Sequence, residues 1–326
     1  MKLSVFLSLS ISIVLVSACE KEPVSHKSLP ANAYIADFTV ATEQFIRNIP
    51  EEYIDYARNN FHIAYQHTSH GTHVSYGLFG LQDYKPGDEV LFGITNNDPA
   101  ENKLDFHDYA IENFAAPGED APDLSQGETT FVQATRNYLD SPDNADINVV
   151  MWSWCNIAGH DVANNYLPGM QALINEYGFG GSKIGLGEGM RVNAVTFIFM
   201  TGHANTGDNV GEGKPKNQAE LITEFCKQNH QYCLDYYSID THDMQNIYWE
   251  DTGDDGNSES YGGNFYSDWQ NAHTLGQHYF ENKSSPNGSV TFGAHNSQHI
   301  TANRKAYAMW YILACIAGYN PEEGTN

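Results

Sequence analysis

The sequence predicts an α/β protein, folded as a three-layer α/β/α sandwich around a mostly parallel sheet. Short apolar runs alternate along the chain with longer amphipathic segments, an alternation typical of parallel strands joined by crossover helices. The clearest strands are 61–65 and 147–152, which are largely apolar and β-branched at their centres. The sequence shows no repeat or heptad pattern, so we expect a single domain.

The expected elements follow one another in a regular order. A helical pattern covers residues 35–59 with a break at Pro50, and the strand at 61–65 comes next. Residues 84–123 are rich in Pro, Gly, Asn and Asp, which predicts loops around a short strand at 89–94. Further helices are expected at 129–139, 166–177, 218–229 and 302–317, and further strands at 147–152, 194–200 and 232–239.

The first 18 residues have the features of a bacterial lipoprotein signal peptide. Lys2 is followed by an apolar run that is too short for a comfortable membrane span, and then by small residues. Val16-Ser17-Ala18-Cys19 resembles a lipobox, which implies cleavage before Cys19 and lipidation of its thiol. An ordinary cleaved signal is the alternative. We expect a lipid-anchored protein of the bacterial cell envelope, at the outer rather than the inner membrane because Glu20 follows the cysteine.

The domain organisation follows from the composition after the signal peptide. Residues 19–33 form a short tether, and residues 34–320 form the folded domain. Within that domain, residues 249–288 are acidic and rich in Gly and Asn, which indicates a long insertion.

Charge and cysteine content exclude several classes of partner. The 326 residues carry a formal net charge of −25 with only 16 Lys and Arg, so nucleic acid is not expected as a partner. Contact with a membrane is expected only through the lipid anchor. The sequence has no glycine-rich phosphate loop, and we expect no cofactor. The four later cysteines allow three complete disulfide pairings, which the sequence leaves open: Cys155, Cys226, Cys233 and Cys315.

Ser69 is the first candidate nucleophile. It lies in the polar turn between the apolar run at 61–65 and a segment that can open a helix, a position that projects from the carboxyl edge of a parallel sheet. Backbone N–H groups at such a helix start can hold a developing oxyanion. The alternative is that Ser69 only caps the helix. Three other short stretches fall at strand ends or helix starts: 124–130, 154–156 and 295–301.

The order of these stretches resembles that of the SGNH hydrolases, the GDSL-type esterase superfamily, over about residues 60–318. Ser69 stands where that family has its serine, and Gly127 and Asn156 match its glycine and asparagine. His299 matches its histidine and lies shortly before the last helix, which we expect Thr301 to cap. The resemblance implies a flavodoxin-like fold, Ser69 as nucleophile, His299 as base, and an oxyanion site made of Gly127 and Asn156.

The triad acid is where the sequence departs from this pattern. Asn296 occupies the place of the family's aspartate, and an amide carries no charge to stabilise an imidazolium. Three alternatives remain open: a Ser–His dyad, a carboxylate from Asp240 or Asp268, or His295 as the base.

A cluster of histidines supports two further interpretations. His67, His70 and His73 recur at every third residue and His203 follows a later strand, so a zinc hydrolase is an alternative, although the spacing is not His-Glu-x-x-His. We expect no metal, and instead expect His70, His203 and Trp154 to line a substrate cleft. The acidic stretch at 251–259 is similar to a calcium loop but has glycine at its twelfth position, which favours a solvated loop.

Together these features predict an exported serine esterase whose substrate is a small acyl group, such as acetyl, on a carbohydrate. A small ester of another kind is also compatible with the site. The alternative from a different class is a glycan-binding surface lipoprotein that has lost catalysis on an SGNH-like scaffold, favoured by Asn296 and by an aromatic content of 13%.

Overall fold

The computed structural model describes residues 34–119, 123–127, 129–290, 292, 295 and 297–322. Their centre is a seven-stranded sheet with the order β1-β7-β6-β5-β2-β4-β3, and every neighbouring pair is parallel. The predicted α/β fold with a parallel sheet is therefore confirmed. The strands are β1 (Ile35–Ala36), β2 (His62–Gln66), β3 (Ile94–Asn96), β4 (Leu104–Asp108), β5 (Val149–Trp152), β6 (Thr196–Met200) and β7 (Tyr232–Leu234).

The strand order places a topological switch point between β2 and β5. The chain passes from β2 to β3 and β4 on one side of the sheet, and then returns to β5 on the other side of β2. The five central strands lie in the order β4-β2-β5-β6-β7. If β2 is counted as the first of these five along the chain and β4 as the second, this is the doubly wound order 2-1-3-4-5. In such sheets the crevice outside the carboxyl ends of the two strands at the switch point is the usual ligand site.

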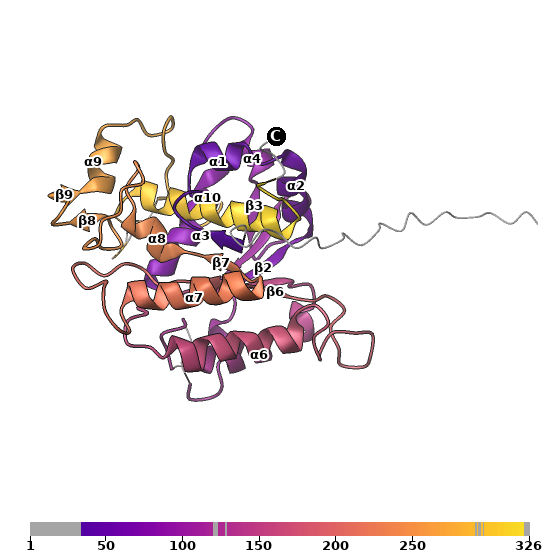
Figure 1. Cartoon of the computed structure of the whole chain (residues 1–326). Helices are drawn as coiled ribbons and strands as arrows, with labels where there is room; N and C mark the ends of the chain where they lie inside the picture. Colours follow the sequence, from indigo (N-terminus) through magenta and orange to yellow (C-terminus); the bar gives the residue numbers. More distant parts are fainter. Residues whose placement is uncertain are drawn as a thin grey trace, which may run out of the picture.

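Helices cover both faces of the sheet. One face carries α1 (Glu43–Arg47), α2 (Glu51–Asn60), α3 (Thr72–Leu81) and α10 (His299–Ile316), and the other carries α5 (Thr130–Leu139), α6 (Leu167–Tyr177) and α7 (Pro215–Asn229) (Figure 1). The buried helix α10 packs closely along α3. A Cβ on Gly77 would lie 2.1 Å from the carbonyl oxygen of Ala302, so this close approach requires glycine.

The prediction for residues 84–123 was wrong in its details. The expected strand at 89–94 is instead the short helix α4 (Asp88–Leu91), followed by β3. Gly87, with φ of 95°, leads into α4, and Arg47 holds Asp88 in an ion pair. β4 lies where only loops were expected, because its charged residues masked the strand pattern.

Several other boundaries differ from the prediction. The helical pattern expected at 35–59 is divided among β1, α1 and α2, and two further differences have a cause in the hydrogen bonds. The strand expected at 232–239 ends at Leu234, because Asp235 accepts a hydrogen bond from the Ser238 N–H at 3.3 Å and caps α8 (Tyr236–Thr241). The last helix begins at His299 rather than at residue 302. The Thr301 hydroxyl, expected to cap it, lies inside the helix and donates to the Gln298 carbonyl at 2.9 Å.

The acidic insertion is folded against the start of α10. It contains β8 (Asn257–Ser258), β9 (Gly263–Asn264) and α9 (Phe265–Asn271), which lie together at one end of the molecule (Figure 1). The Tyr266 hydroxyl donates to the Ile239 carbonyl at 2.6 Å, and Gln270 accepts from the Ile300 N–H at 2.8 Å. These bonds fix the insertion next to the carboxyl edge of the sheet.

The predicted signal peptide, the lipidation site Cys19 and most of the tether lie outside the described residues, as does Asn296. None of the helices in the described part of the chain combines the length and the apolarity that a bilayer crossing requires.

Candidate active site

The turn after β2 positions Ser69 at the switch point. β2 runs into a 3₁₀ turn at Ser69–Gly71, which leads directly into α3. A Cβ on Gly71 would lie 2.2 Å from the Cβ of His67 and 2.5 Å from the Ser153 hydroxyl oxygen. Only glycine therefore lets the turn pass so close to the end of β5.

The Ser69 hydroxyl lies between an imidazole and a thiol. Its Oγ is 3.4 Å from Nδ1 of His70 and 3.6 Å from Sγ of Cys155. Cys155 follows β5, so the two strands at the switch point supply neighbouring polar groups. A distance of 3.4 Å is long for a hydrogen bond but is common for a nucleophile and its base before substrate binds.

A carboxylate from the insertion reaches the other side of the same imidazole. Oδ2 of Asp254 lies 3.2 Å from Nε2 of His70 and 3.4 Å from Nδ1 of His295. His70 also stacks between two other rings, with centroid distances of 3.6 Å to His203 and 4.0 Å to His295. The side chain of His70 is only 6% exposed, and that of Asp254 15%, so the pair is largely removed from water.

The electrostatics of the site raise the pKa of His70 and lower that of His203. Burial alone would lower the pKa of His70, but the nearby Asp254 carboxylate and Cys155 thiol outweigh it and raise the pKa to about 9. Burial opposes ionisation of Asp254, yet His70 holds its pKa at about 2. Burial, followed by the charge of His70, lowers the pKa of His203 to about 4. The hydrogen bond from His70 lowers the pKa of the Cys155 thiol.

His67 belongs to the scaffold of the turn. Its Nε2 lies 2.8 Å from Oδ1 of Asp108, and its Nδ1 lies 3.0 Å from the carbonyl oxygen of Thr68. Both ring nitrogens have acceptors, and the ring is fully buried. This pair ties the end of β2 to the end of β4.

The loops that carry Gly127 and Asn156 border the same edge of the sheet. Asp123 accepts a hydrogen bond from the Thr68 hydroxyl, and the Leu124 N–H donates to the Ser153 carbonyl at 2.9 Å. This loop ends in Gly127, whose φ is 64°. Asn156 is exposed beyond Cys155, and its Oδ1 accepts from the Asn205 amide at 3.3 Å.

His299 and Trp154 lie in other surroundings. Nδ1 of His299 accepts from the Asn282 N–H at 3.2 Å, and its ring packs against Phe292 and Tyr279. None of the contacts among the described residues joins His299 to Ser69. Trp154 is 3% exposed and donates its indole N–H to the Met200 carbonyl at 2.9 Å, so it forms part of the core.

The two aspartates suggested as triad acids are engaged elsewhere. Asp240 is buried in an ion pair with Lys305 of α10, and it accepts from the Ala204 N–H at 3.1 Å. Asp240 thereby supports the loop that carries His203. Asp268 accepts from the Tyr261 hydroxyl at 3.1 Å.

Asp254 is the site residue that the sequence analysis missed. It lies in the acidic stretch that resembled a calcium loop, but the neighbouring carboxylates have different partners. Asp251 accepts from the Ser258 hydroxyl at 2.7 Å and Asp255 from the Asn257 N–H at 3.1 Å. The only signal in the sequence was the density of acids beside glycines, which does not identify the one that turns inward.

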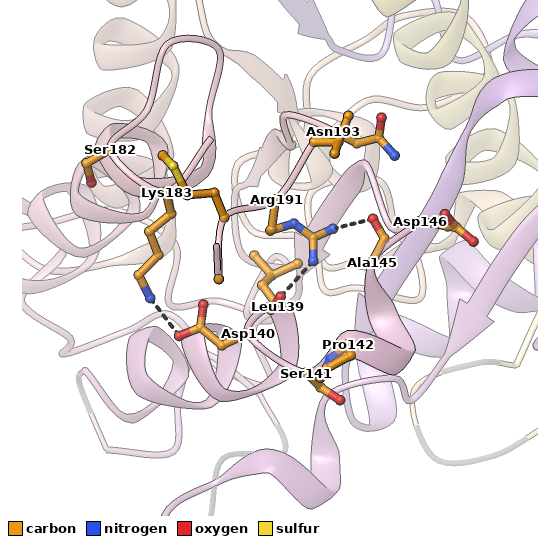
Figure 2. A pocket seen from close by; sticks show the side chains of 13 residues that line it. Leu139, Asp140, Ser141, Pro142, Ala145, Asp146, Ser182, Lys183, Arg191 and Asn193 are labelled. Atoms are coloured by element: carbon orange, nitrogen blue, oxygen red, sulfur yellow. Dashed lines mark hydrogen bonds and ion pairs between the residues drawn. The ribbon is translucent and has the colours of Figure 1, made fainter. Parts of the chain in front are cut away.

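A cavity of about 560 Å³ lies at the opposite edge of the sheet (Figure 2). It is formed by loops that precede β5 and β6. Its two cations are already engaged: Arg191 donates to the carbonyls of Leu139 and Ile147 at 2.6 Å each, and Lys183 pairs with Asp140 at 2.6 Å. This cavity therefore lacks the reactive groups that gather at the carboxyl edge.

Comparison of the chain with protein-family models, with curated proteins and with solved structures found no match. The function is therefore argued from the geometry of the site itself.

Proposed function

We propose that this protein is a serine hydrolase that cleaves a small ester, with Ser69 as nucleophile, His70 as general base and Asp254 as the carboxylate that supports the base. The observation that carries this proposal is the array of three groups at the switch point. Ser69 Oγ faces Nδ1 of His70 at 3.4 Å, and Asp254 faces Nε2 of the same ring at 3.2 Å. Such a nucleophile, base and acid are recognised by geometry and not by their order in the chain.

The reaction would proceed in two stages. His70 Nδ1 accepts the Ser69 proton as Oγ attacks the ester carbonyl, and Asp254 stabilises the resulting imidazolium. The imidazolium then gives its proton to the leaving alcohol, which leaves an acyl group on Ser69. In the second stage His70 takes a proton from water as the water oxygen attacks the acyl carbonyl. The imidazolium then returns that proton to Ser69 Oγ as the bond to the acyl group breaks, which releases the acid and restores both residues.

The proposed oxyanion site uses donors that border the array. The backbone N–H groups of Ser69 and Gly127 and the amide of Asn156 are the candidates from the sequence. The Gly127 loop is tied to the turn through Thr68 and Asp123, and Asn156 follows Cys155. Preorganised donors of this kind are each worth about 10²–10³ in kcat.

The base in this proposal is His70 rather than His299 or His295. A base has to lie within reach of the proton that it removes, and His70 is the imidazole in contact with the Ser69 hydroxyl. Asn296 stands where the SGNH family has its aspartate. Because Asp254 supplies the carboxylate in this proposal, the site does not need an acid at position 296.

The finer assignments also belong to this proposal. The five central strands have the doubly wound order, Ser69 follows β2 and Asn156 follows β5. This arrangement supports an SGNH-type scaffold. The lipobox at Cys19 supports a lipid-anchored protein of the cell envelope, where acylated carbohydrates are available as substrates.

The test is hydrolysis of p-nitrophenyl acetate by wild type, Ser69→Ala and Ser182→Ala. Ser182 lines the cavity at the opposite edge of the sheet and serves as the matched control. We expect turnover by wild type and Ser182→Ala, and loss of at least about 10³-fold in Ser69→Ala. Equal rates for wild type and Ser69→Ala contradict the proposal. If both lack activity on this and on acetylated sugars, the non-catalytic glycan-binding alternative is favoured.

A further inference from the structure

The group His70, Asp254 and His295 has the spacing of a metal site. One ligand atom from each residue lies within 4.8 Å of the other two. Zinc bonds of about 2.0–2.2 Å in a tetrahedron place neighbouring ligand atoms about 3.3–3.5 Å apart. The Asp254 carboxylate oxygen lies 3.2 Å from Nε2 of His70 and 3.4 Å from Nδ1 of His295, which is close to that separation.

Several buried atoms at this site lack hydrogen-bond partners among the described residues. They include Nε2 of His70 and Oδ2 of Asp254, which are close together but not aligned as a hydrogen bond requires. Nε2 of His203, on the ring stacked against His70, is also unpartnered. Buried polar atoms without partners are rare and costly, and a bound ion is one explanation for several in one place.

The outer contacts hold His70 and its stacked neighbour His203 through one ring nitrogen each. Nδ1 of His203 donates to the Ala204 carbonyl at 2.8 Å, which leaves its Nε2 lone pair free. Nδ1 of His70 faces the Ser69 hydroxyl and Nε2 faces Asp254. An imidazole held through one nitrogen, with the other directed into the site, is the usual arrangement of a metal ligand.

We propose that His70, Asp254 and His295 bind a divalent transition-metal ion of the zinc type, and that this ion inhibits the serine chemistry. Two imidazoles and one carboxylate suit zinc rather than calcium or magnesium, which prefer sites made of oxygen ligands. With three protein ligands, the fourth position of a tetrahedral ion takes water. The inhibitory part of this inference rests on the proposed function.

The inhibition follows because a neutral imidazole has only one nitrogen with a free lone pair. A metal on Nε2 uses that lone pair, so the neutral ring keeps its one proton on Nδ1. That N–H can donate a hydrogen bond to Ser69 Oγ but cannot accept the Ser69 proton. The Asp254 carboxylate then coordinates the ion and no longer supports His70 as a base. Binding to the protonated His70 releases one proton, because the ligand form is the neutral ring.

The binding test uses the full chain with Co²⁺ as a spectroscopic probe and Zn²⁺ as competitor. We expect one equivalent of Co²⁺ with the visible absorption of a four-coordinate site, displaced by Zn²⁺. His295→Ala and Asp254→Asn should each weaken binding by at least about tenfold. His107→Ala is the matched control, since His107 pairs with Asp105 of the same strand, β4, at 2.9 Å and is not one of the proposed ligands. Absence of stoichiometric binding, or equal affinities in all four proteins, overturns the proposed site.

The inhibition test is separate from the binding test. We expect Zn²⁺ to suppress ester hydrolysis by wild type, and His295→Ala to need at least about tenfold more Zn²⁺, each compared with its own metal-free rate. Unchanged or increased turnover on metal binding overturns the inhibitory role. If the protein has no esterase activity, the Co²⁺ titration still decides whether the site exists, so the two proposals fail independently.

Discussion

Two histidines three residues apart, His67 and His70, follow β2, and each pairs with an aspartate. The two pairs differ in how many of their polar atoms are hydrogen-bonded. His67 meets Asp108 at 2.8 Å and also donates from Nδ1 to a backbone carbonyl, so the ring is held on both sides. His70 meets Asp254 at 3.2 Å without hydrogen-bond alignment, and its other nitrogen faces the Ser69 hydroxyl.

This difference predicts that the His67 pair mainly stabilises the fold and that the His70 pair mainly serves function. The His67 pair joins neighbouring strands of the sheet and leaves neither ring nitrogen without a partner. The His70 pair joins the sheet to a long insertion and leaves buried atoms that a substrate proton or an ion can use. Removing His67 should therefore cost stability, whereas removing His70 should cost function.

The largest effect is expected from His70→Ala. Without the base, kcat for p-nitrophenyl acetate should fall by about 10³-fold or more. The free energy of unfolding should fall by less than in His67→Ala, because Asp254 keeps His295 at 3.4 Å as a second partner. Steady-state kinetics together with urea unfolding measure both quantities. A large loss of stability in this variant would remove the distinction between the two pairs.

The second effect is expected from His67→Ala. This change leaves the buried Asp108 carboxylate without its partner, so the free energy of unfolding should fall by about 3 kcal/mol. Chemical denaturation of His67→Ala beside His70→Ala gives the comparison directly. Equal stability of the two variants would show that His67 is not the structural member.

Asp254→Asn should change both rate and pH dependence. With the His70 pKa at about 9, only about one imidazole in a hundred is neutral at pH 7, so kcat/KM should rise with pH until about 9. The charges facing His70 are Asp254 and the Cys155 thiol, with His73, His203 and His295 nearby. Removing the Asp254 charge should shift the profile to lower pH by at least about one unit.

The same variant should also lower the maximal rate by about 10²-fold. The rate of Ser69→Ala at each pH serves as the blank for spontaneous hydrolysis. An unchanged profile in Asp254→Asn means that this carboxylate does not act on the base.

The smallest effect is expected from Cys155→Ala. The thiol touches the Ser69 hydroxyl at 3.6 Å and its pKa is lowered by His70, which makes it the competing nucleophile. If Ser69 is the nucleophile, the rate should fall by less than about tenfold. Inactivation of wild type by iodoacetamide, with full loss of activity in Cys155→Ala, would assign the chemistry to the thiol instead.

The sequence predicted those parts of the molecule whose signals are local. The apolar run of β5, the amphipathic pattern of α5 and the position of Ser69 after a buried strand were readable from neighbouring residues. β4 was missed because Asp105 and His107 give it a polar appearance, although Asp105 is paired with both His107 and His62.

The composition of the site was less predictable. Asp254 reaches His70 from an insertion far along the chain, and nothing in the local sequence separates it from Asp251 and Asp255. Whether His299 stands before the last helix or within it depended on a single cap, and Thr301 was not that cap. Long-range contacts of this kind require the folded chain.

The most direct test of the central claim is labelling with a fluorophosphonate probe, followed by peptide mass spectrometry. We predict a single adduct on Ser69 of the folded wild type, and strongly reduced labelling in His70→Ala. An adduct on Cys155 or another residue, or equal labelling of Ser69 in wild type and His70→Ala, would contradict the proposed array.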